Sequence, residues 1–116
     1  MEFDPRDKIE LANCIADEIK REFKDIHFSY NLVRTMKVEI EGNNVTIDVP
    51  AMKFNIKQYK LYRVIKYYYR GSYANLINYT GGFSGRHQNW TERCIENGIS
   101  KWLAQKGKQG RISYNE

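Results

Sequence analysis

The chain has 116 residues, of which 41% are hydrophobic and 28% are charged, and its formal net charge is +5. This length can build one modest core but not separate substrate and cofactor domains, so we expect a single domain. No apolar run approaches the roughly 20 residues of a membrane span, and "MEFDPRDK" lacks the apolar segment of a secretion signal, so we expect neither.

The first predicted element is an amphipathic helix that runs to about Lys24. Asp4 supplies an N-cap oxygen, and Pro5 fits the first helical position. Apolar residues then recur at three- and four-residue spacing: Ile9, Ala12, Ile15, Ala16, Ile19 and Phe23. Cys14 lies beside this stripe and is interpreted as a small core residue.

A β-hairpin is predicted next. Met36, Val38 and Ile40 alternate with charged residues, "GNN" supplies a turn at 42–44, and alternation resumes from Val45 to Val49. Residues 51–66 fit both a strand and a helical stripe. We favour extended structure at both ends of this segment, because "VIKYYY" is rich in β-branched and aromatic residues.

A second amphipathic helix is predicted near the C-terminus. Asn89 and Glu92 have the spacing of a capping box, and an apolar face follows that ends near Gly107: Cys94, Ile95, Ile99, Trp102 and Leu103. The order of elements predicts an α+β fold, in which an antiparallel sheet containing the hairpin packs against the N-terminal and C-terminal amphipathic helices. We expect one domain over 1–106 and a flexible or partner-ordered arm over 107–116.

Catalytic and metal-binding motifs are weak in this sequence. Cys14, His27, His87 and Cys94 stand singly, without zinc-ligand spacing, and the two cysteines do not suggest a disulfide framework, which favours synthesis in a reducing cytosol. Ser84 and His87 are three residues apart, but a catalytic triad needs an orienting acid, and none occurs between Asp48 and Glu92. The glycines of "GGFSGRH" match no nucleotide-binding motif, so we expect them to supply positive φ and close backbone approach. We therefore predict no metal, no cofactor and no catalytic residue.

The centre of the chain is basic and rich in tyrosine. No Asp or Glu occurs from Val49 to Thr91, and most of the tyrosines fall in this block. Such a block suits protein interfaces and nucleic-acid platforms alike. For the second alternative, a small nucleic-acid-binding protein, the contact residues would be Lys53, Lys57, Lys60, Arg63, Lys66 and Arg70.

The sequence also resembles a known family. Leu32 and Thr35 precede the hairpin, Tyr73–Ala74 is followed by Ile77, Asn78 and Gly81–Gly82, and "GRHQNWTERCIENGISKWL" closes the domain from Gly85 to Leu103. This pattern, spanning Ile9 to Leu103, is similar to the tail-completion, or head-tail joining, proteins in the neck of long-tailed bacteriophages. The chain departs from it where members often have a glycine near the hairpin start and a "PFLRPA"-like segment, here "GRHQNW".

The resemblance implies a non-enzymatic virion protein, made in the host cytoplasm, that assembles into an oligomeric ring at the neck or tail junction. Its implied partners are identical copies, other neck, connector or tail proteins, and DNA passing through the ring; no membrane is implied. We expect Tyr73, Ala74, Leu76 and Ile77 to form a short packed turn. The expected subunit-interface residues are Tyr67, Tyr68, Tyr69, Tyr73, Phe83, Arg86, His87 and Trp90. A third alternative is an enzyme, such as a nuclease that uses His87.

Overall fold

The computed structural model describes residues 3–24, 26–59 and 61–109 and has the α+β fold that the sequence predicts. A short 3-10 turn, η1 (Pro5–Asp7), leads into α1 (Lys8–Glu22) and α2 (Ile26–Thr35). Four strands follow: β1 (Lys37–Glu41), β2 (Asn44–Asp48), β3 (Met52–Gln58) and β4 (Arg63–Tyr69). The last described elements are α3 (Tyr73–Thr80) and α4 (Trp90–Gln109).

Asp4 and Pro5 start a 3-10 turn, and not α1 itself as the sequence predicted, because α1 begins at Lys8. The Asp4 carboxylate accepts a hydrogen bond from the backbone N–H of Arg6 at 2.9 Å, and Pro5 opens the turn that precedes the helix. The buried residues of α1 are Leu11, Cys14, Ile15, Ala16 and Ile19. The predicted apolar stripe was wrong at its first position, because Ile9 is exposed and Leu11, two residues further along on the other side of the same turn, is buried instead.

The four strands form one antiparallel meander in the order β1-β2-β3-β4. The predicted hairpin is present, with Gly42 at a φ of 61° in its turn and Val38 opposite Ile47. The segment that was ambiguous in the sequence forms β3 and the start of β4, so the extended interpretation is confirmed. Every second residue of β3, from Met52 to Gln58, is buried, which gives the sheet one inner and one outer face.

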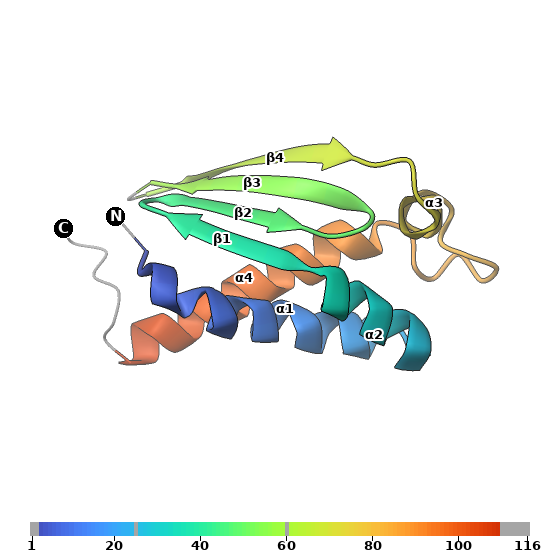
Figure 1. The fold of residues 1–116 in the computed structure, drawn as a ribbon, viewed down its shortest axis with the longest axis horizontal. Helices are drawn as coiled ribbons and strands as arrows, with labels where there is room; N and C mark the ends of the chain where they lie inside the picture. Colours follow the sequence, from blue (N-terminus) through green and yellow to red (C-terminus); the bar gives the residue numbers. More distant parts are fainter. Residues whose placement is uncertain (1–2, 25, 60, 110–116) are drawn as a thin grey trace.

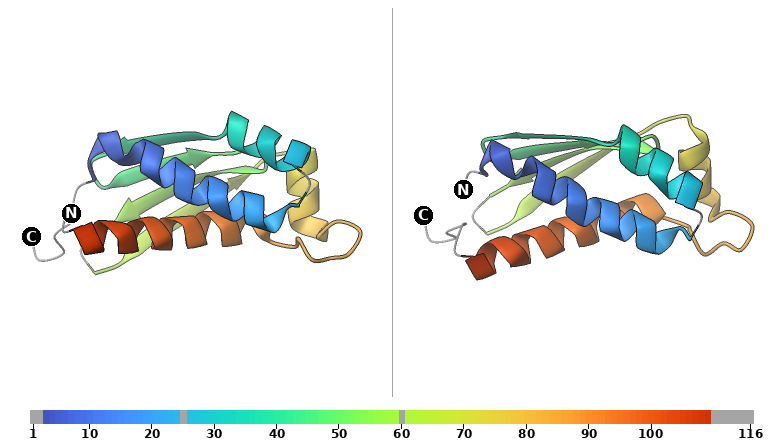
Figure 2. Two further views of the ribbon diagram at one scale, coloured as in Figure 1. Left: turned by 90° about the horizontal axis from the view of Figure 1, so that it is seen from below. Right: turned by 60° about the horizontal axis from the view of Figure 1, so that its bottom comes forward.

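The helices cover only one face of the sheet. Figure 1 shows α1 and α4 beneath the strands and the outer face of the sheet open. Figure 2 shows α1 and α4 side by side. Gly98 permits this close approach, because a Cβ at this position would lie 2.7 Å from Cγ1 and 2.9 Å from Cα of Ile15. The largest fully buried side chains are Trp90, Trp102 and Phe54.

Two helices and one boundary differ from the sequence-based expectation. Helix α2 was not predicted; its buried residues include Ser29 and Leu32. The expected turn at residues 73–77 is a helix of 8 residues, α3. Helix α4 continues past Gly107 to Gln109, and residues 110–116 of the predicted C-terminal arm lie outside the described residues.

Candidate functional site

Helix α3 carries an exposed apolar ridge at one end of the molecule. Tyr73, Leu76 and Tyr79 recur every third residue, so they share one face of the helix, and they are 67%, 54% and 78% exposed. Phe83, just beyond the helix, is fully exposed. We call these four residues the α3 ridge. Because α3 lies beyond the end of the sheet (Figure 1), the ridge is on an end surface and not over the core.

Helix α3 is capped at both of its ends. Ser72 Oγ accepts a hydrogen bond from the backbone N–H of Asn75 at 3.2 Å and donates one to the carbonyl of Pro50 at 2.7 Å. One hydroxyl therefore caps the helix and fixes it to the β2–β3 connection. At the other end Gly81 has a φ of 84°, and its N–H donates to the carbonyl of Ile77 at 2.7 Å.

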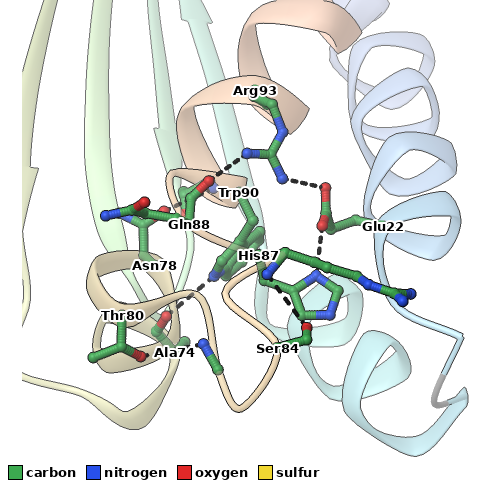
Figure 3. A network of polar contacts seen from close by, with 12 residues as sticks. Glu22, Ala74, Asn78, Thr80, Ser84, His87, Gln88, Trp90 and Arg93 are labelled. Atoms are coloured by element: carbon green, nitrogen blue, oxygen red, sulfur yellow. Dashed lines mark hydrogen bonds and ion pairs between the residues drawn. The ribbon is translucent and has the colours of Figure 1, made fainter.

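Asn78 connects the buried side of α3 to the start of α4 (Figure 3). Its side-chain Oδ1 accepts from the backbone N–H of Thr91 at 2.9 Å, and its carbonyl accepts from the N–H of Asn89 at 2.8 Å. Beside it, the indole Nε1 of Trp90 donates to the carbonyl of Ala74 at 3.2 Å. A residue of another helix therefore caps the N-terminus of α4.

Two sequence-based predictions fail at this junction. The expected capping box requires Asn89 in an extended conformation, but its φ is 59°, and the Glu92 carboxylate accepts from the Tyr69 hydroxyl at 2.8 Å instead. Trp90, expected at a subunit interface, is fully buried, because its indole packs in the core against Phe23, with ring centroids 5.0 Å apart. Trp90 is therefore not part of a surface site.

The connection from α3 to α4, residues 81–89, is a tight loop that we call the glycine loop. Gly81, Gly82 and Gly85 have φ values of 84°, 74° and 73°, a region that favours glycine. A Cβ on Gly81 would lie 2.5 Å from the carbonyl oxygen of Gly85, so two backbone segments meet there. The prediction that these glycines have positive φ is confirmed, and Gly81 also provides close backbone approach.

A partly buried polar contact ties the glycine loop to the end of α1. His87 Nδ1 lies 2.5 Å from one carboxylate oxygen of Glu22, and Arg93 donates to the other at 2.7 Å (Figure 3). Arg93 also donates to the carbonyl of Gln88. Burial raises the pKa of the Glu22 carboxyl, but the hydrogen bonds from His87 and Arg93 outweigh it and hold that pKa below its usual range. The His87 ring also packs on Phe23, with centroids 4.6 Å apart.

This contact bears on the serine–histidine pair noted in the sequence. Glu22 supplies the acid beside His87 that the sequence lacked. Ser84 Oγ instead accepts from the backbone N–H of Arg86 at 3.3 Å, and the described polar contact of the His87 ring is with Glu22.

Residues 3–24, 26–59 and 61–109 contain no group of three or more His, Cys, Asp or Glu side chains that could hold a metal ion. No helix in those same ranges combines the length and apolar content that crossing a membrane requires.

Two open grooves flank the α3 ridge, each with a volume of about 670 Å³. The groove on the β4 side includes Tyr69 and Glu92 in its lining. The groove on the α2 side includes Phe28 and Phe83. Both grooves are also lined by Tyr73 and Leu76, so the ridge and the grooves form one continuous surface rich in aromatic side chains.

The structure separates the other predicted interface residues. Tyr67 and Tyr69 lie on the inner side of β4, where their hydroxyls donate to Glu96 at 2.6 Å and Glu92 at 2.8 Å. Burial, followed by the bond to Glu96, raises the pKa of Tyr67, whereas the bond to Glu92 is the main reason why the pKa of Tyr69 is raised. Tyr68 faces the opposite side of the sheet and is exposed. In the glycine loop Arg86 is exposed and His87 is half-buried.

The outer face of the sheet mixes basic and acidic side chains. Lys53, Lys57 and Lys66 face outward from β3 and β4. The acidic residues on the same face are Glu39, Glu41 and Asp48. Asp48 pairs with Arg70 at 2.7 Å. Arg63 is half-buried at the start of β4, and Lys60 lies outside the described residues, so the predicted basic block does not form one uniform positive surface.

Sequence reasoning missed part of this site. It placed Leu76 in a packed turn and did not include Tyr79 or Glu22 among the candidate residues. The three-residue spacing of Tyr73, Leu76 and Tyr79 in "YANLINYT" is the sequence signal that could have identified the ridge. Glu22 and His87 are 65 residues apart, and no local pattern links them.

No protein-family model, curated protein or solved structure matches this chain. The resemblance to phage tail-completion proteins therefore stays a prediction.

Proposed function

We propose that this protein is a structural subunit that acts by self-assembly, as a tail-completion or head-tail joining component of a bacteriophage neck. The α3 ridge is the observation that supports assembly. It exposes Tyr73, Leu76, Tyr79 and Phe83 together at one end of the molecule, between two open grooves. Contiguous exposed apolar patches mark interaction sites, and aromatic residues are enriched in protein interfaces.

The choice of a phage neck depends on the sequence resemblance. It implies a closed ring in which two different patches of each copy meet, and a ring of this kind forms when the rotation between copies closes. Such a ring would contact neighbouring neck, connector or tail proteins and leave a passage for DNA. The ridge would supply one of the contact patches.

The test of assembly uses substitutions on the ridge. Leu76→Glu and Tyr79→Glu place a charge in the centre of the patch, so we expect each variant to remain folded and to lose the assembled species in sedimentation velocity. Ile9→Glu is the matched control, because Ile9 is a similarly exposed apolar residue on α1, at 67%, that is not part of the ridge. A wild-type protein that stays monomeric at every concentration and is missing from purified phage particles by mass spectrometry would refute the proposal.

A second candidate function is nucleic-acid binding, which the three outward lysines of β3 and β4 favour. If Lys53, Lys57 and Lys66 each contact a phosphate of duplex DNA, the logarithm of the affinity should fall with the logarithm of salt concentration with a slope of roughly −3. Replacing all three with Gln should remove that dependence. The acidic residues on the same face oppose phosphate binding, so we place this candidate second.

A further inference from the structure

The two edges of the sheet are complementary in direction. Strands β1 and β4 are the outer strands, and within the described residues neither pairs on its outer side with another strand. An edge strand of this kind offers N–H and C=O groups that another chain can pair with. Because the meander has an even number of antiparallel strands, β1 and β4 run in opposite directions. The β4 edge of one copy can therefore continue antiparallel into the β1 edge of the next.

The inner apolar rows of the sheet are incomplete at β4. One row runs through Val38, Ile47 and Phe54, all buried, and reaches Tyr67, which is only half-buried. A second row passes through Ile56 and ends at Ile65, which is also only half-buried. Helix α1 contacts β1, whereas the inner face of β4 lies at the far side of the sheet. A second copy joined through its β1 would bring its own α1 toward this partly covered face.

The charges on the outer face select one register. In an aligned pairing of β4 with β1 of the next copy, the rows continue straight across the boundary, so that Glu39 lies opposite Lys66. Shifting the next copy by two residues in one direction sets Lys37 opposite Lys66, which puts like charges in direct opposition and destabilises a strand pair. Shifting it in the other direction keeps an ion pair, Glu41 opposite Lys66, but sets Lys37 opposite Arg70, just past the end of β4. The aligned register avoids both like-charge contacts and has an ion pair.

We propose that identical copies of this chain join head to tail by pairing β4 of one copy antiparallel with β1 of the next, with Glu39 opposite Lys66. This inference rests on the proposed function, since it names the partner and the contact through which the subunit assembles. It uses a surface distinct from the α3 ridge, so assembly would depend on two contacts, the paired strand edges and the ridge. Head-to-tail contacts of this type can close a ring.

Engineered cysteines test the pairing directly. Within one chain, Glu39 and Lys66 are separated by three strand spacings, or about 14 Å, which exceeds the Cα separation of about 7 Å that a disulfide tolerates. Glu39→Cys combined with Lys66→Cys should therefore form a ladder of linked species beyond the dimer on a non-reducing gel. Each single variant should give no ladder. The native Cys14 and Cys94 are buried, and burial raises the pKa of Cys94 to about 12, so both native thiols should react slowly.

A register control sharpens the result. Lys37→Cys combined with Lys66→Cys moves one thiol by two residues along β1, which places it out of disulfide reach in the aligned pairing. We expect this pair to give no ladder. A ladder from the control pair, or strong dimerisation of the single Lys66→Cys variant through a two-fold contact, would overturn the inference.

A charge swap provides a second, non-covalent test. Glu39→Lys or Lys66→Glu should weaken self-association about three- to tenfold, since a cross-strand ion pair becomes a like-charge pair. The double variant Glu39→Lys/Lys66→Glu should recover wild-type association. Because the two positions are too far apart to interact within one chain, recovery has to come from contact between copies. Thermal melting of each variant shows whether the monomer fold is unchanged.

The outcomes separate the two proposals. If the protein assembles but the Glu39→Cys/Lys66→Cys variant forms no ladder and the charge swap does not restore association, β1–β4 pairing is wrong and the assembly function stands. If the wild-type protein is monomeric under all conditions, both proposals fail.

Discussion

Asn78 gives a direct test of how the α3 ridge is held against the rest of the domain. Asn78→Ala removes the Oδ1 that accepts from the N–H of Thr91 at 2.9 Å, and these residues are 3% and 0% exposed. A buried donor left without a partner costs about 1–3 kcal/mol, and the loss of a helix cap costs about 0.5–2 kcal/mol. Both values describe the same bond, so we expect a loss of about 2 kcal/mol. For a domain of this size that lowers Tm by about 8 °C.

The assay is urea unfolding followed by tryptophan fluorescence, because Trp90 and Trp102 are both buried. Asn78→Asp keeps an acceptor oxygen and adds a negative charge at the start of α4, so this variant should recover most of the lost stability. Asn75→Ala is the matched control, since the described bond of Asn75 uses its backbone N–H. Two results would show that the cap is not the stabilising contact. One is an Asn78→Ala variant as stable as the wild type, and the other is an Asn78→Asp variant no more stable than Asn78→Ala.

Two further predictions concern the contacts of α1. Gly98→Ala places a methyl group 2.7 Å from Cγ1 of Ile15. The overpacking should cost about 1–3 kcal/mol, more than the roughly 1 kcal/mol that alanine contributes to a helix, so the variant should unfold at lower urea concentration than the wild type. A variant of equal or greater stability would refute the clash. The lowered pKa of Glu22 means that its bonds to His87 and Arg93 stabilise the fold above the ordinary carboxyl pKa and that this contribution is lost as the pH falls through the folded-state pKa. The stability difference between the wild type and Glu22→Gln should therefore shrink from about pH 7 to about pH 3 in urea titrations, and a constant difference would contradict this.

Much of the fold follows from local patterns, because several elements bury one face. The hairpin alternates strictly, so its strands and its turn at Gly42 could be located by sequence alone. The C-terminal helix shows its face through Cys94, Ile99 and Trp102. Helix α2 was missed because its 10 residues follow closely on α1 and include the polar residue Ser29 among those that are buried.

The candidate site was harder to predict, because residues of the same chemical class lie in opposite environments. Trp90 and Tyr73 are both aromatic and lie on the two helices that the glycine loop joins, yet Trp90 is buried and bonded to Ala74, whereas Tyr73 is exposed. Composition identifies the aromatic block but not which rings face solvent. The placement of Glu22 beside His87 likewise depends on how α1 meets the glycine loop, which is a property of the folded chain.

In the glycine loop, the residues that anchor the loop to the helices are different from the residues that are exposed. Its first residue bonds to α3 and His87 bonds to α1, while Phe83, Ser84 and Arg86 are exposed between them. Substitutions at those three positions therefore alter the displayed chemistry with little effect on the fold. A lineage could change its recognition preferences by editing only this tip, and libraries randomised there are a practical route to variants with new affinities.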